Sequence, residues 1–135
     1  LYSNTQNISF SQSQVGDSLP VDFPRHYDGV FCLDVFEHIK PVDSHNFASF
    51  VLSSLGKYGQ FVCGIPSKES QVHASSGSKA GHVHCLSGVD FKQFWERYFY
   101  SVNIFGMNDE VLHTGFLPMC HYLIVVCSQP RESNL

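Results

Sequence analysis

The 135-residue sequence has few charged residues and no run of basic ones. Asp, Glu, Lys and Arg make up 15% of the chain, and the formal net charge is −4. Nucleic-acid-binding and membrane-surface proteins usually carry clustered Lys and Arg, so the composition argues against both nucleic acid and membrane as partners. The longest apolar stretch, residues 122–127, is far too short to span a bilayer.

Cysteine motifs of the kind that bind zinc are also missing. The five cysteines are odd in number, and no two of them form a Cys-x-x-Cys pair. Cys32, Cys63 and Cys127 lie inside apolar runs, which is typical of buried, reduced thiols. We therefore expect a cytoplasmic protein without a cysteine-based zinc site.

Apolar residues make up 43% of the chain, enough to build the core of one domain. Near-continuous apolar runs predict strands that are buried on both faces. They lie at residues 27–33, 60–65, 100–105 and 121–127, and a shorter alternating segment lies at 8–12. Helical spacing predicts one helix over 44–55, capped by Ser44, and a second helix capped by Ser87. Residues 67–81 and 106–119 are expected to be long loops.

Strands that alternate with helices predict an α/β fold with a mostly parallel sheet. The last two strands have no helix between them, so we expect them to be antiparallel neighbours. The strand at 121–127 should then lie between those at 60–65 and 100–105.

Segments along the chain resemble, in order, the later half of the class I S-adenosylmethionine-dependent methyltransferases. They are ISFSQSQVGDSLP (8–20), YDGVFCLDVFEHI (27–39), LGKYGQFVCGIP (55–66), and the pair GHVHCLS (81–87) and FGMNDEVLHTGF (105–116). The most specific match is LDVFEHI, which is similar to the family's "D-V-x-E-H" signature after its fourth strand. The resemblance implies that residues 1–135 are the C-terminal part of one Rossmann-like methyltransferase domain, with one antiparallel strand near its C-terminus.

One hallmark of that family is not in this sequence. The family's first strand ends in a Gly-x-Gly-x-Gly loop that approaches the cofactor, and none of the ten glycines here recurs at that spacing. The resemblance therefore implies that this chain lacks the glycine-rich half of the domain. By itself it should be inactive and should not bind S-adenosylmethionine measurably, because no glycine loop lets the backbone approach the ligand.

The resemblance also implies cofactor contacts. Ser13, Gln14 and Val15 match the adenine-contacting turn, where the family often has Asp in place of Gln14. A Gln can accept from the adenine amino group through its carbonyl oxygen, but without charge. Asp34 follows a buried strand, and ligands in open α/β sheets bind beyond the carboxyl ends of strands. The alternative is that Asp34 merely caps the helical turn after it.

Glu37, His38 and His82 are the predicted catalytic residues. If the segment is helical, Asp34, Glu37 and His38 share one face, where carboxylates beside an imidazole can act as a general base or bind a divalent cation. The small-RNA 2′-O-methyltransferases and the ubiquinone-pathway enzymes carry Glu-x-x-Glu-His at the matching place and bind a metal. Because Asp34 replaces the first Glu, we assign no metal ligand here. His82 matches the family position better than His84, although both can be loop histidines bonded to backbone.

The predicted function is methyl transfer from S-adenosylmethionine to oxygen or nitrogen of a small-molecule acceptor, with His113 and Thr114 as further candidates for lining its pocket. Two alternatives stay open. One is a non-catalytic half-domain that binds a protein partner through an exposed sheet edge. The other is a metal-dependent hydrolase that uses Asp34, Glu37, His38 and His82.

Overall fold

A computed structural model describes residues 8, 12 and 26–131 of the chain. Its strands are β1 (Tyr27–Leu33), β2 (Leu55–Pro66), β3 (Phe99–Asn108), β4 (Val111–His113) and β5 (Tyr122–Pro130). Its α-helices are α1 (Ser44–Ser54), α2 (Ser76–Gly81) and α3 (Gly88–Glu96). Short 3₁₀ turns are η1 (Phe36–His38), η2 (Pro41–Asp43), η3 (Glu69–His73) and η4 (Leu117–Met119). Ser13, Gln14 and Val15 lie outside the described residues, as does most of the strand predicted at 8–12.

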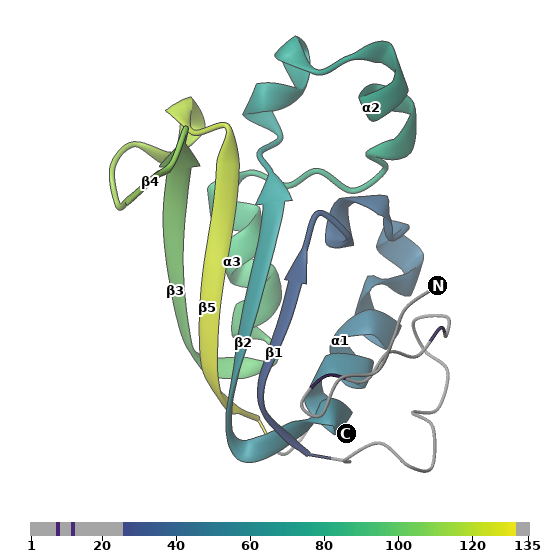
Figure 1. Cartoon of the computed structure of the whole chain (residues 1–135), viewed down its shortest axis with the longest axis vertical. Coiled ribbons are helices and arrows are strands. Elements are labelled where there is room, and N and C mark those ends of the chain that lie inside the picture. The colour runs from purple at the N-terminus through teal and green to yellow at the C-terminus, as the bar shows by residue number, and fades with distance from the viewer. Residues whose placement is uncertain (1–7, 9–11, 13–25, 132–135) are drawn as a thin grey trace.

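The five strands form one mixed sheet in the order β1-β2-β5-β3-β4 (Figure 1). The predicted α/β class is confirmed, and so is the position of β5 between β2 and β3. The prediction of a mostly parallel sheet is wrong, because β1–β2 is the one parallel pair in the described sheet and the other three pairs are antiparallel. The reason is the insertion itself: β2 and β3 run in the same direction, but β5 separates them and pairs antiparallel with both.

The two predicted helix caps have different outcomes. Ser87 caps α3 as expected, with its Oγ accepting from the Asp90 backbone N–H at 3.2 Å. Ser44 lies inside α1 instead, and its Oγ donates to the Pro41 carbonyl oxygen at 2.7 Å. The 3₁₀ turn η2 leads directly into α1, so the helix is wound from Pro41 onward and needs no serine cap.

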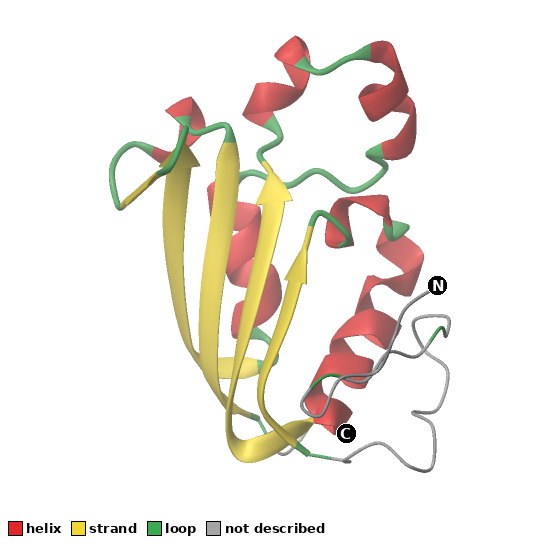
Figure 2. Cartoon of the chain, in the orientation of Figure 1, coloured by secondary structure: helices red, strands yellow, loops and turns green. Residues whose placement is uncertain are grey.

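The two predicted long loops both contain regular structure. Residues 67–81 include η3 and α2, which form an excursion beyond the carboxyl end of β2 (Figure 2). Ser75 caps α2 by accepting from the Ser78 backbone N–H at 3.1 Å. Residues 106–119 include the end of β3 and the short strand β4. These elements are too short to show an apolar period by which the sequence could reveal them.

The sheet has two unlike faces. One face, here called the closed face, packs on α1 and α3, and Figure 1 shows α3 behind the strands. Its buried strand residues are Cys32, Phe61, Cys63, Ile65, Leu123, Val125 and Cys127. Trp95 of α3 lies at its centre, with ring centroids 4.7 Å from Phe61 and 5.5 Å from Phe36. The closed face therefore holds the hydrophobic core.

The other face, here called the open face, is formed by the alternate residues of the same strands: Phe31, Leu33, Val62, Phe105, Ile124 and Val126. Phe31 is 77% exposed and Leu33 is 47% exposed. No helix of the described chain lies over these strands on this side (Figure 1). Among the described residues, no helix is long and apolar enough to cross a membrane.

Candidate active site

The candidate site begins where β1 ends. The backbone N–H of Asp34 donates to the Gly64 carbonyl oxygen at 3.1 Å, which extends the parallel β1–β2 ladder by one bond. Asp34 then adopts φ 55°, in the left-handed region, and the chain turns into η1. Asp34 is therefore not helical, and the prediction that it shares a helical face with Glu37 and His38 is wrong.

Two residues of η1 are buried, Phe36 and Glu37, and Glu37 is the charged one. Its side chain is 1% exposed, and its Oε2 has no hydrogen-bond partner among the described residues. Burial is the main cause that raises the pKa of Glu37, and the negative charge of Asp34 raises it further, while His38 and His82 lower it. A buried carboxylate oxygen without a partner costs free energy, so this oxygen is available to bind a ligand.

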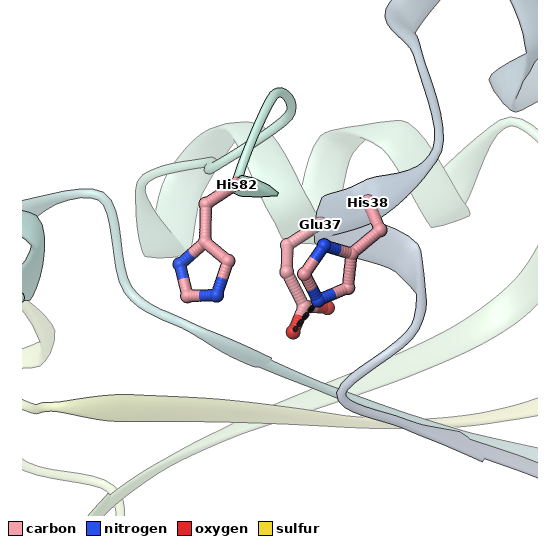
Figure 3. A group of neighbouring side chains, drawn as sticks. All are labelled: Glu37, His38 and His82. Atoms are coloured by element: carbon pink, nitrogen blue, oxygen red, sulfur yellow. Dashed lines mark ion pairs between the residues drawn. The ribbon is translucent and has the colours of Figure 1, made fainter. Parts of the chain in front are cut away.

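Two histidines from different segments converge on Glu37 (Figure 3). His38 follows it in η1, with its Nε2 3.7 Å from Glu37 Oε1. His82 comes from the segment just after α2, and its ring centroid is 5.1 Å from that of His38. One ligand atom from each of the three residues lies within 4.8 Å of the others. The structure thus brings together the three residues predicted to be catalytic.

Each histidine is held by a hydrogen bond at Nδ1. His38 Nδ1 is 2.9 Å from the Gly81 carbonyl oxygen, and His82 Nδ1 is 2.8 Å from Gln71 Oε1. A carbonyl oxygen can only accept, so both Nδ1 atoms carry a proton, and in the neutral form of each ring the lone pair is on Nε2. The backbone N–H of His84 also donates to the Glu37 carbonyl oxygen at 3.0 Å, which ties the segment after α2 to η1.

The remaining predicted residues have other roles. His84 is partly buried and packs its ring 5.0 Å from that of Phe36, and burial lowers its pKa. His113 lies on β4, at the opposite edge of the sheet from β1, and its Nε2 is 3.8 Å from Cys120 Sγ. Asp34 is exposed and lies near Tyr122, whose pKa is raised by burial and by the charge of Asp34. None of the three belongs to the Glu37 cluster.

Gln71 is a residue that the sequence analysis missed. It lies in η3, in a segment read as a polar loop, and nothing in the local pattern distinguishes it from the other polar residues there. Its contact with His82 depends on how η3 and α2 fold back toward η1. A spatial contact of this kind has no signal in a single sequence.

No protein-family model and no curated protein sequence matches the chain. Solved structures do match. The small RNA methyltransferase HEN1 is 20% identical, with a TM-score of 0.58 over 82% of this chain and 15% of that one. A SAM-dependent methyltransferase from Archaeoglobus fulgidus is 13% identical, with a TM-score of 0.58 over 77% of this chain and 60% of that one. The 1,6-didemethyltoxoflavin-N1-methyltransferase of Burkholderia thailandensis is 12% identical, with a TM-score of 0.55 over 87% of this chain and 48% of that one.

The chain has the fold of S-adenosylmethionine-dependent methyltransferases. It spans 60% or less of the length of these solved methyltransferases. The match to the methyltransferase fold explains why the candidate site lies beyond the carboxyl ends of β1 and β2, since ligands of open α/β sheets bind at that edge. The named substrates of these structures include a small RNA and a small molecule, so the shared fold does not select the acceptor.

Proposed function

We propose that this chain is the C-terminal part of an S-adenosylmethionine-dependent methyltransferase that methylates a hydroxyl group of a small molecule. The observation that carries the proposal is the buried Glu37 carboxylate, which faces two histidine side chains at the carboxyl edge of a methyltransferase-type sheet. Methyl transfer from a sulfonium is an in-line displacement, and a hydroxyl acceptor must also lose its proton. The cluster supplies the groups for that second task.

The roles follow from the hydrogen bonds. His38 and His82 each have Nδ1 bound to a carbonyl oxygen, so Nε2 is the atom that can take the proton from the acceptor. The Gly81 and Gln71 carbonyl oxygens orient the two rings. The Glu37 carboxylate, 3.7 Å from His38 Nε2, stabilises the imidazolium that forms. The low charge of the chain and its lack of basic clusters support a small acceptor in preference to nucleic acid.

The same three residues also fit a divalent cation. Their donor set is one carboxylate and two imidazoles, and each imidazole is oriented by a carbonyl on its far nitrogen, which is the usual arrangement around metal-binding histidines. The unpartnered Glu37 Oε2 would be satisfied by such an ion. When bound, the ion would supply Lewis-acid activation of the acceptor hydroxyl. Asp34, exposed on the turn before η1, is not among the three.

The proposal is tested in two steps. In the gene product that contains this chain, we expect His38→Ala and His82→Ala to lower the methyl-transfer rate about a hundredfold while S-adenosylmethionine affinity stays within about twofold. His73→Ala, an exposed histidine of η3, is the matched control. Full activity in both site variants would refute the catalytic assignment. Loss of activity with a chelator and its return with added cation would show that the metal role holds.

The cofactor half of the proposal has its own test. Isothermal calorimetry of the 135-residue chain alone should show no measurable heat with S-adenosylmethionine, because the sequence has no Gly-x-Gly-x-Gly loop. Tight binding by this chain would overturn the view that another segment supplies most of the cofactor site.

A further inference from the structure

His82 is the member of the cluster whose position is hardest to account for, because it lies 44 residues after His38 in a segment with little regular structure around it. The short helix α2 ends at Gly81, and the His82 ring lies 5.1 Å from the ring of His38. The contact that fixes it is the 2.8 Å hydrogen bond from Nδ1–H to Gln71 Oε1.

The amide of Gln71 is itself oriented. Its Nε2 donates to the Ser67 carbonyl oxygen at 3.2 Å. Since that carbonyl can only accept, the nitrogen end of the amide must face Ser67, and the oxygen end must therefore face His82. If the amide flipped, its oxygen would face the Ser67 carbonyl oxygen, and the hydrogen bond to Ser67 would be lost.

Ser67 is in turn fixed to the sheet. It is fully buried, its backbone N–H donates to the His121 carbonyl oxygen at 2.9 Å, and its Oγ donates to the Cys120 carbonyl oxygen at 2.6 Å. A continuous path of hydrogen bonds therefore runs from the residues before β5, through Ser67 and Gln71, to the His82 ring.

We propose that Gln71 is a positioning residue that holds His82 in the Nδ1–H tautomer and so leaves Nε2 as the ring atom that can accept a proton or bind an ion in the cluster with Glu37 and His38. The effect of Gln71 on activity rests on the proposed function, but its effect on the His82 tautomer does not. Neutral imidazole has two tautomers, and which nitrogen can accept a proton or bind a cation is set by the hydrogen bond on the other. Without Gln71, His82 would keep its place in the chain but lose the constraint on its ring.

The test measures the tautomer directly. Two-bond ¹⁵N–¹H correlation spectra of the labelled 135-residue chain at about pH 8, where imidazole is neutral, assign the protonated nitrogen of each histidine. We expect Nδ1–H for His82 in the native chain. In Gln71→Met, of similar length without the acceptor, the His82 signals should shift to a mixture of tautomers. His38, which bonds to Gly81, should stay unchanged in both proteins.

The matched control is Gln93→Met, which changes an exposed glutamine of α3. An Nε2–H tautomer of His82 in the native chain, or an unchanged Nδ1–H tautomer in Gln71→Met, would overturn the inference. Since the native spectrum alone can refute it, the test does not depend on the variants folding.

Titration of the same proteins with Co²⁺ separates this inference from the proposed function. If the cluster binds the ion, Gln71→Met should weaken affinity about 10- to 100-fold, the usual effect of removing a group that orients a metal-binding histidine, and Gln93→Met should not. Equal affinity in Gln71→Met and the native chain would count against Gln71. Absence of Co²⁺ binding in the native chain would count against the metal role of the cluster, while the tautomer result would still decide the role of Gln71.

Discussion

The closed and open faces of the sheet are built from the same strands and both carry large apolar residues, yet one is buried and the other is partly exposed. Phe61 on β2 is fully buried, whereas Phe31 on the neighbouring strand β1 is 77% exposed. Cross-strand rows such as Leu33, Gly64, Ile124 and Phe105 run across the open face without a helix of the described chain above them. The comparison shows that an apolar strand sequence predicts a surface suited to packing. It does not predict whether a helix covers that surface.

The largest effect should come from matched phenylalanine substitutions on the two faces. Phe61→Ala removes a ring that contacts Trp95 and Phe99, and we expect it to lower the free energy of unfolding by about 3–5 kcal/mol. Phe31→Ala should lower it by less than about 1 kcal/mol, since little burial is lost. Urea denaturation measures both. Equal losses would break the comparison, because they would mean that the open face is covered in solution.

An intermediate effect is expected from glycine substitutions. A Cβ added at Gly106, on the side of β3 that packs against Cys120, would lie 2.2 Å from the Cys120 Sγ atom. Gly106→Ala should therefore cost about 1–3 kcal/mol from overpacking. Gly29→Ala on β1 meets its nearest atom, the Gln60 carbonyl oxygen, only at 3.9 Å and should change stability by less than about 0.5 kcal/mol. Thermal unfolding of the two variants under one buffer condition distinguishes these outcomes, and a larger loss in Gly29→Ala would contradict the packing described for β1.

The smallest effect on stability is expected at Glu37, which lies where the closed face meets the candidate site. Burial raises its pKa, so between the pKa of an unfolded glutamate and the raised folded value the folded chain holds more protons. The free energy of unfolding should therefore decrease as pH rises through that window. Glu37→Gln should remove this decrease and be about 1 kcal/mol more stable above the window.

Urea midpoints between about pH 4 and pH 8 measure this change. Glu110→Gln, at an exposed position next to β4, is the control and should leave the pH dependence as it is in the native chain. A native-like pH dependence in Glu37→Gln would mean that this carboxylate is not the buried group described here. A stabilised variant would show that the site is held at a cost to the fold, as is common for functional groups.

Strands β1, β2, β3 and β5 and the two longer helices could be predicted from the sequence because each contains enough apolar residues to display its period. Residues 27–33 and 121–127 are examples, and both lie at the expected places in the chain. Whether neighbouring strands are parallel could not be read in the same way. The prediction of a mostly parallel sheet counted strand directions correctly but missed that β5 changes every pairing around it.

The candidate site was predictable to the extent that it lies in one motif. Glu37 and His38 are adjacent and follow the apolar run of β1, which places them at the carboxyl edge of any parallel pair. The approach of His82 depends on contacts such as that between His38 and the Gly81 carbonyl oxygen, 43 residues apart. Asp34 was misplaced because a left-handed φ at a non-glycine residue has no sequence signal that separates it from a helical start.

The position of β5 has a consequence for the order of folding. It is the last strand of the described chain, yet it lies in the middle of the sheet and pairs with both β2 and β3. Gln60 of β2 pairs with Ser128 of β5, although the two residues are far apart in the sequence. During synthesis, β1 with β2 and β3 with β4 can form as separate units, but the sheet can be joined only after β5 has left the ribosome. Because loop closure over such separations is slow, the joining of the two units should be the late step of folding.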